Sequence, residues 1–270
     1  MTALALKLVL TPALIAIATL SGRRWGPSIG GWLVGLPFTS GPVSFFLAIE
    51  QGTPFAAAAA AGSIGGAAAS ALFAVAYAAL ARRFAWPASL AGASLAFFAG
   101  IGILRALPLG SDLPVPLLPL YLGTLVCCGI SAWLIAEPGH VAPGVPAPRW
   151  DLPARMAVAT ALVVSITTAA PILGPQLTGL LTTYPIYASV LAVFAHAQRG
   201  PVAATHVIRG LCFGLLAFAS FFFTIGALID RAGIVVGFAA AIAAALAVQT
   251  MTLVWLRSEA SRSRTASRSL

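Results

Sequence analysis

Residues 201–229 read PVAATHVIRGLCFGLLAFASFFFTIGALI, and this stretch decides the class of fold. Its one formally charged residue is Arg209, and the residues around it are mostly apolar or small. At 1.5 Å per residue, a helix of this length crosses the roughly 30 Å hydrocarbon core of a bilayer. Polar and apolar residues do not alternate, as the strands of a membrane barrel would require. The stretch therefore predicts a membrane-spanning helix.

The rest of the chain has the same character, because 60% of its residues are hydrophobic and 8% are charged. Mean hydropathy is +1.00, and so few charged side chains cannot cover a soluble globule of 270 residues. We therefore expect an all-α integral membrane protein with nine transmembrane helices. The expected spans are residues 3–22, 27–50, 54–81, 84–106, 114–136, 153–172, 175–198, 201–229 and 233–256.

Counting crossings assigns most basic residues to one side of the bilayer. That side holds Arg23, Arg24, Arg82, Arg83, Arg149, Arg155, Arg199, Arg257, Arg262, Arg264 and Arg268, and the other holds Lys7, Arg105 and Arg231. The richer side is expected to be cytoplasmic, which places the N-terminus outside and the C-terminus inside a bacterial inner membrane. Because the basic residues follow the helix ends, they indicate topology and not a nucleic-acid-binding surface.

Sliding the sequence against itself by 148 residues aligns it without a gap. The matches include Gly26-Pro27 with Gly174-Pro175, Gly31 with Gly179, Pro37 with Pro185, Gly52 with Gly200, Gly62 with Gly210, and Gly66 with Gly214. We expect two four-helix repeats, residues 1–106 and 153–256, joined by a connecting helix at 114–136. An odd connector inverts the second repeat, whereas a re-entrant 114–136 would make the repeats parallel. Residues 137–152 are expected to form a cytoplasmic loop, and the basic tail at 257–270 to be disordered.

The second span of each repeat carries helix-breaking residues near its middle. Residues 35–42 read GLPFTSGP and residues 182–189 read TTYPIYAS, so the breaking positions are Gly35, Pro37, Gly41, Pro42 and Pro185. Both segments are expected to be non-helical and to meet near the midplane, facing protein or water. The candidate substrate-binding residues are Thr39, Ser40, Thr182, Thr183, Tyr184, Tyr187 and Ser189. The alternative is that the prolines only kink packed helices and the hydroxyls bond within their own helix.

Ionisable residues inside the expected spans are functional candidates, because burying a charge in a bilayer is costly. Arg209 is the strongest and joins the substrate-binding candidates, although its side chain is also able to reach the membrane surface. The candidates for coupling or for lining a vestibule are Lys7, Glu50, Arg155, His196 and His206. The remaining acidic residues, Asp112, Glu137, Asp151, Asp230 and Glu259, are expected to be solvated in loops, at helix ends or in the tail.

No residue pattern indicates catalysis, a metal site or a cofactor: Cys127, Cys128 and Cys212 lie in apolar runs without metal-ligand spacing. The crossed broken helices resemble those of bile-acid symporters and sodium–proton antiporters in architecture alone. The paired acidic residues typical of the antiporters are absent, which argues against cation exchange. We expect a secondary transporter or exporter for a small carboxylate-like anion, not an enzyme, with proton coupling left open. The alternatives are a passive channel and a membrane-embedded subunit without transport activity. The expected partners are the anion and the lipid bilayer, with a homodimer left open.

Overall fold

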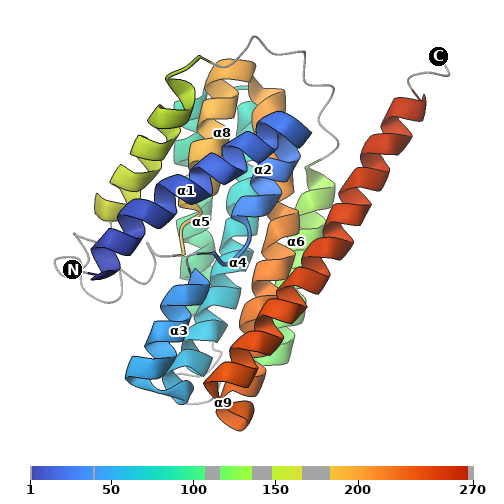
Figure 1. The fold of residues 1–270 in the computed structure, drawn as a ribbon. Helices are drawn as coiled ribbons and strands as arrows, with labels where there is room; N and C mark the ends of the chain where they lie inside the picture. The colour runs from blue at the N-terminus through green and yellow to red at the C-terminus, as the bar shows by residue number, and fades with distance from the viewer. Residues whose placement is uncertain (1, 39, 107–115, 136–147, 166–182, 267–270) are drawn as a thin grey trace.

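The computed structural model describes residues 2–38, 40–106, 116–135, 148–165 and 183–266 (Figure 1). Of residues 2–7, 105 and 257–266 it describes the backbone alone. All regular secondary structure in these ranges is helical. The helices are α1 (Thr2–Trp25), α2 (Pro27–Val34), α3 (Ser40–Gln51), α4 (Thr53–Ala81), α5 (Trp86–Ala106), α6 (Leu117–Leu134), a helix over residues 151–165, α8 (Ile186–Arg199) and α9 (Pro201–Ala266).

Helix α9 is a hairpin of two arms, because its backbone leaves helical geometry at Gly233, where φ is 80°. A residue with a side chain rarely adopts such a φ, so glycine suits this reversal. Figure 1 shows the two arms side by side, the first running down the view and the second returning. The second arm continues as helix to Ala266, whereas the sequence predicts a disordered tail from residue 257.

Four helices among the described residues are long and apolar enough to cross a bilayer. They are Thr53–Ala81, Trp86–Leu104, Leu117–Leu134 and Pro201–Leu256, the last being the hairpin of α9. Their outward faces are apolar, as the exposed side chains of Leu95, Val126 and Val235 illustrate. The chain therefore has the fold of a helical membrane protein.

Helix α4 and the first arm of α9 pack together at the centre of the molecule, and the other helices surround this pair (Figure 1). Two main groups of buried side chains fill the core. One combines Phe73, Tyr77 and Phe97 of α4 and α5 with residues of α8. The other combines Phe221 and Ile225 of α9 with Ala48 and neighbours on α3 and α4. The core thus joins α3 to both arms of α9, and α8 to α4.

The turns Gly52 and Gly200 are 148 residues apart, and both have positive φ, 89° and 82°. Each precedes a helix that begins with a proline within its first two positions. Proline suits the first turn because that turn has no use for the missing N–H. The same turn chemistry is therefore used at two positions that the sequence alignment pairs.

Candidate functional site

The first helix break separates α2 from α3. Helix α2 ends at Val34 and α3 begins at Ser40, so the helix is interrupted where the sequence predicts it. The interruption is shorter than the predicted 35–42, because Gly41 and Pro42 are helical. Proline is tolerated in the first turn of a helix, where its missing N–H has no intrahelical acceptor. The chain between Val34 and α3 is held by the Phe38 N–H to the Leu36 carbonyl, at 2.8 Å.

The second break precedes α8. Residues Thr183 to Pro185 are non-helical and α8 begins at Ile186, so the predicted non-helical range 182–189 is again too long. Tyr187 and Ser189 lie inside α8. Figure 1 shows α3 running from its break towards the lower end of the molecule and α8 running from its break towards the upper end.

The predicted binding hydroxyls do not all face one space. The Tyr184 hydroxyl lies 2.7 Å from Ser94 Oγ of α5, and the Tyr187 hydroxyl lies 3.2 Å from Thr11 Oγ1 of α1. Ser189 Oγ donates to the Pro185 carbonyl at 2.9 Å. This local bond is the one expected if the hydroxyls serve their own helix and do not bind a substrate. Thr39 and Thr182 lie outside the described residues, and Ser40 is half-buried at the start of α3.

Aromatic packing fixes the second break against α4 and α5. The Tyr184 ring centroid lies 5.8 Å from Phe73 and 5.4 Å from Phe97, both edge-on. It also stacks on Phe98 at 6.1 Å. Such pairs contribute about 0.5–1.5 kcal/mol each beyond their buried area. The break is therefore a packed structural element with a defined position.

Two close approaches at the breaks are related by the 148-residue offset. A Cβ on Gly35 would lie 2.5 Å from Gly214 Cα, and a Cβ on Gly66 would lie 2.8 Å from Thr183 Cβ. Adding 148 to Gly35 gives Thr183, and adding 148 to Gly66 gives Gly214. The contact between break one and α9 thus has a counterpart between break two and α4.

Glycines bring the backbones of α2 and α9 into direct contact. A Cβ on Gly31 would overlap the Val207 carbonyl, and a Cβ on Gly210 would overlap the Ser28 carbonyl. Small residues four apart allow this approach between membrane helices, as Gly210 and Gly214 do on α9. The contact fixes α2, the helix that precedes the first break, against α9 at the centre of the molecule.

A cavity of about 480 Å³ opens near the end of the molecule where α1 and α8 finish. It lies between α1, α2, α8, α9 and the 151–165 helix. Its lining residues are Ala18, Thr19, Gly22, Arg23, Pro27, Gly30, Pro148, Asp151, Arg155, Leu191, Ala195, Gln198, Arg199 and Val207. Tyr187 is one turn from Leu191 on α8, so the same helix connects the second break with the cavity.

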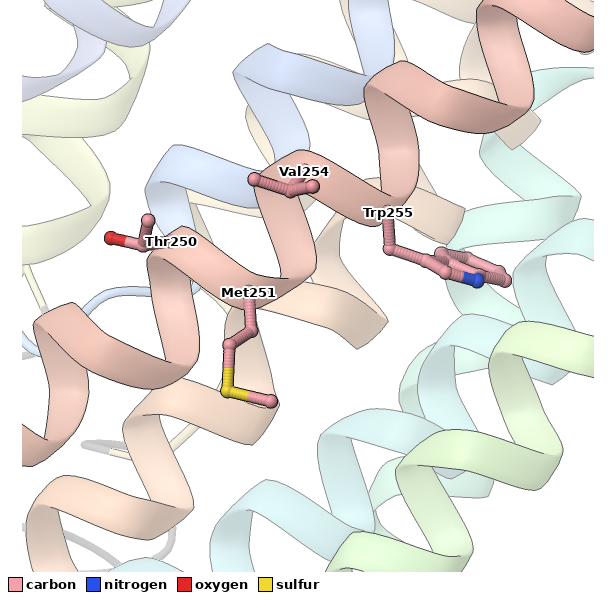
Figure 2. Close-up of a pocket in the computed structure, with 4 residues that line it drawn as sticks. All are labelled: Thr250, Met251, Val254 and Trp255. Carbon is pink, nitrogen blue, oxygen red and sulfur yellow. The ribbon is translucent and has the colours of Figure 1, made fainter.

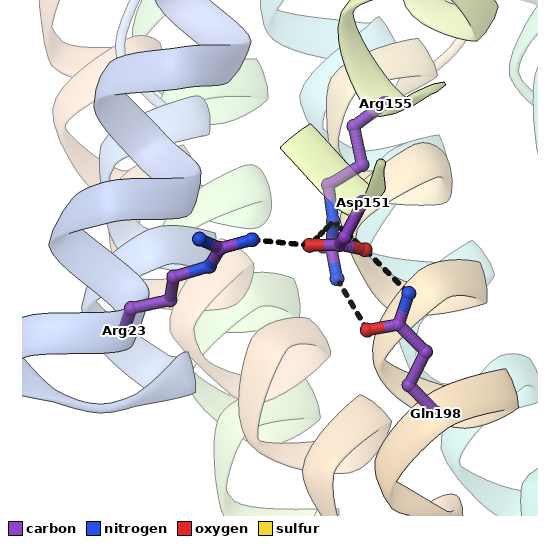
Figure 3. A network of polar contacts seen from close by, with 4 residues as sticks. All are labelled: Arg23, Asp151, Arg155 and Gln198. Atoms are coloured by element: carbon purple, nitrogen blue, oxygen red, sulfur yellow. Dashed lines mark hydrogen bonds and ion pairs between the residues drawn. The ribbon is translucent and has the colours of Figure 1, made fainter. Parts of the chain in front are cut away.

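Asp151 is the centre of a polar network in this cavity (Figure 3). Arg23 Nη2 donates to Asp151 Oδ2 at 2.6 Å. Arg155 Nε lies 2.9 and 3.0 Å from the two carboxylate oxygens. Gln198 Nε2 donates to Oδ1, and Arg155 Nη2 lies 3.5 Å from Gln198 Oε1. The network therefore joins α1, the 151–165 helix and α8.

The prediction that Asp151 is a solvated loop residue is wrong. Its side chain is 0% exposed, and Arg155 is 8% exposed. Burial without partners would disfavour the charged carboxylate, but two guanidinium groups and an amide offset that cost. The spacing of Asp151 and Arg155, four residues apart at a helix start, is the sequence signal that indicates such a pair.

The pKa of Asp151 reflects opposing effects. Burial acts to raise this pKa, whereas hydrogen bonds from Gln198, Arg23 and Arg155 lower it. The hydrogen bonds prevail, so the pKa of Asp151 lies below its ordinary value. Asp151 is therefore a carboxylate at neutral pH.

Arg209 does not line this cavity. Its Nε lies 3.4 Å from the Ala132 carbonyl of α6, and its guanidinium lies over the rings of Phe213 and Trp255 at 5.7 and 5.8 Å. A backbone carbonyl and aromatic faces thus provide polar contacts for this charge. Its predicted role in substrate binding stays a prediction.

The other ionisable candidates have separate surroundings. His206 Nδ1 lies 3.1 Å from Ser28 Oγ, and His196 Nδ1 lies 3.4 Å from the Tyr77 hydroxyl. Glu50 is exposed at the end of α3, and the Lys7 side chain lies outside the described residues. Among the candidates whose side chains the structure describes, Arg155 is the one that lines the cavity. Sequence reasoning did not identify its cavity neighbours Arg23, Thr19 and Asp151 as site residues.

A second hollow lies on the outer face of the second arm of α9 (Figure 2). It is lined by Thr250, Met251, Val254 and Trp255, which all belong to one helix. Met251 and Val254 are exposed and apolar, which suits contact with lipid acyl chains. This hollow lacks the charged lining of the Asp151 cavity.

Comparison of the chain with known protein families, with curated proteins and with solved structures finds no match. The class that the fold and composition define is a helical membrane protein, whose described part contains a charged cavity and two helix breaks.

Proposed function

We propose that this protein is a secondary transporter or exporter for a small organic anion. The observation that carries the proposal is the charge of the cavity. Three arginines, Arg23, Arg155 and Arg199, line it with one described acidic residue, Asp151, which leaves a surplus of two positive charges. A partly enclosed space strengthens electrostatic attraction, so the cavity favours an anion over a cation.

The breaks supply a second source of positive potential. Helices α3 and α8 begin at the breaks, and each helix N-terminus carries about half a positive charge from aligned peptide dipoles. Discontinuous membrane helices of transporters present such N-termini to anionic substrate groups near the midplane. In this proposal the anion passes from the cavity along α8 to a site between the breaks, with Ser40 and Thr183 at its edge.

The proposal includes two inverted repeats, within residues 1–106 and 153–256. The paired contacts Gly35–Gly214 and Gly66–Thr183 support a two-fold relation between the halves, as do the paired turns Gly52 and Gly200. The opposite directions of α3 and α8 support inversion. An inverted pair allows alternating access, because each half takes the conformation of the other when the site changes sides.

The proposed location is the bacterial inner membrane, with the N-terminus outside and the cavity on the cytoplasmic side. The arginines that end α1 and α8 support this orientation, because Arg23 and Arg199 lie at the cavity end of the molecule.

A passive channel is the second candidate, and the packed breaks favour the transporter over it. A channel needs a continuous aqueous path, whereas Tyr184 is surrounded by Phe73, Phe97 and Phe98 at the second break. A transporter that alternates between conformations needs no continuous aqueous path, so it is compatible with such packing.

The test is uptake of radiolabelled anions into proteoliposomes that contain the full chain. We expect saturable uptake of at least one small carboxylate from a panel, and a pH gradient applied in separate vesicles reports proton coupling. Non-saturating flux independent of any gradient would favour the channel. Uptake of no anion, in vesicles with verified insertion, would contradict the proposal.

A further inference from the structure

The cavity already contains a bound carboxylate, that of Asp151. Two guanidinium groups and an amide of the surrounding residues hold it, at 2.6 to 3.0 Å for the arginine contacts. Guanidinium groups bind carboxylates with matched geometry, so the internal contact demonstrates the ligand chemistry for which these side chains are arranged. The residues that bind Asp151 are therefore suited to binding the carboxylate of a small molecule.

The cavity offers donors besides those that hold Asp151, and Arg23 belongs to both sets. Thr19 is 5% exposed and lines the cavity, and its Oγ1 has no hydrogen-bond partner among the described residues. A buried hydroxyl without a partner is energetically unfavourable, and a ligand acceptor would remove that cost. The Arg23 side chain is 38% exposed beside it, and Arg199 is exposed at the end of α8. These three side chains come from two helices that face each other across the cavity.

The size and charge of the space define the ligand class. The volume of about 480 Å³ is within the range of small-molecule sites, roughly 300–1,000 Å³. The described lining carries three positive charges and one negative charge, so two remain to be balanced. A monoanion balances half of this surplus and a dianion balances all of it.

We propose that the cavity binds a small dicarboxylate through Thr19, Arg23 and Arg199, in competition with Asp151 for Arg23. This deepens the transport proposal and rests on it for the physiological role of the site. Arg23 is the shared partner because it belongs to α1, whereas Asp151 and Arg155 belong to the 151–165 helix. When the ligand takes Arg23, Arg155 and Gln198 still hold Asp151, so no buried carboxylate is left unpaired.

Equilibrium dialysis of the detergent-solubilised full chain with radiolabelled succinate tests the site without requiring transport. We expect Arg23→Gln to weaken succinate binding at least tenfold, because it removes the shared guanidinium. Arg199→Gln lies at an exposed helix end, so the fold tolerates it, and we expect a loss of threefold or more. The matched control is Arg24→Gln, which removes an adjacent charge that does not line the cavity and leaves binding unchanged.

Asp151→Asn distinguishes competition from a purely structural network. Asparagine keeps an oxygen acceptor for Arg155 but gives up the negative charge, so Arg23 is freed and succinate binding tightens severalfold. A structural role alone predicts weaker succinate binding, and because both cases lower the melting temperature at neutral pH, the direction of the change in binding decides between them. If Asp151→Asn does not fold, the Arg23 and Arg199 variants decide between the outcomes.

The ligand panel tests the dianion class. Succinate should bind more tightly than propionate, and the neutral diamide succinamide should not bind. Tighter binding of inorganic phosphate than succinate would overturn the dicarboxylate assignment. Equal succinate binding by wild type, Arg23→Gln and Arg199→Gln would overturn the site itself. Anion uptake in proteoliposomes that these variants leave unaffected would refute this inference and leave the transport proposal intact. If succinate binds and the Arg23 and Arg199 variants weaken that binding, but no anion is transported, the transport proposal is refuted and this inference stands.

Discussion

Replacing Gly210 by alanine should destabilise the contact between α2 and α9 on which the position of the first break depends. The added Cβ overlaps the Ser28 carbonyl and lies 2.8 Å from the Ser28 carbonyl carbon. Both groups are backbone, so neither moves without shifting a helix. Overpacking of this kind costs about 1–3 kcal/mol, and the better helix propensity of alanine recovers at most about 1 kcal/mol.

Gly102→Ala is the matched control. Gly102 is exposed inside α5, and among the described residues no atom lies within 4 Å of its added Cβ. Alanine there should leave stability unchanged or raise it by up to about 1 kcal/mol. The two variants should thus differ by about 1–3 kcal/mol. At about 2–4 °C per kcal/mol for a chain of this size, their melting temperatures should differ by about 2–12 °C.

Buried cysteines provide the assay. Cys128 and Cys212 are 0% exposed, so a thiol-reactive fluorophore labels them when the detergent-solubilised protein unfolds on heating. The midpoint of labelling gives the melting temperature of each variant. Equal midpoints for Gly210→Ala and Gly102→Ala would refute the close α2–α9 packing.

Four further predictions concern the breaks, the arginine on α9, the ion-pair network and the topology. Pro37→Ala and Pro185→Ala should each insert and fold but lower the transport rate, because a continuous helix is favoured across the break; unchanged uptake would contradict a role for the breaks. Arg209→Lys should weaken apparent substrate affinity about tenfold, through loss of the planar guanidinium, and Arg209→Ala should weaken it more; unchanged kinetics would show that Arg209 serves to pack α9 against α6. Asp151 has a folded-state pKa below its ordinary value, so its stabilisation is complete above about pH 4 and is lost as the pH falls through the folded pKa. Melting temperatures of wild type and Asp151→Asn should therefore converge at acid pH, and a constant difference would exclude this carboxylate as the cause. Reporter fusions should place the N-terminus outside and the C-terminus in the cytoplasm, and a cytoplasmic N-terminus would overturn the nine-span topology.

The class of fold could be predicted from the sequence because the bilayer imposes one simple constraint. A span must be apolar over its whole length and satisfy its backbone internally, so residues 201–229 indicate a helix without knowledge of their neighbours. The turns at Gly52 and Gly200 were equally accessible to prediction, since a glycine followed within two residues by a proline suits a helix start after a positive-φ turn.

The extent of the breaks was harder to predict. Composition places a break at Pro37 and Pro185, but helix propensity does not tell whether the following residues resume the helix. Gly41 and Pro42 do so, because the first turn of α3 tolerates proline. Packing of Tyr184 against Phe73, Phe97 and Phe98 then fixes the second break, and such long-range contacts are not encoded in local spacing.

The charged cavity depends even more on tertiary structure. Asp151 follows a proline-rich segment, and its position alone suggests a solvated loop. Its burial results from Arg23 and Gln198, which are 128 and 47 residues away in the sequence. Only the Asp151–Arg155 pair is local, so spacing in the sequence indicates one of the three partners that hold the carboxylate.

Counterflow in proteoliposomes tests the claim that the protein carries a small anion by alternating access. Vesicles loaded with a high concentration of unlabelled succinate are diluted into a trace of labelled succinate, and internal label is followed with time. Alternating access predicts that label transiently exceeds its equilibrium level in wild-type vesicles, because exchange through one site traps label inside. It also predicts that Arg23→Gln reduces the overshoot and that Arg24→Gln preserves it. Label that only rises to equilibrium without an overshoot, or does not enter at all in vesicles with verified insertion, would contradict the claim.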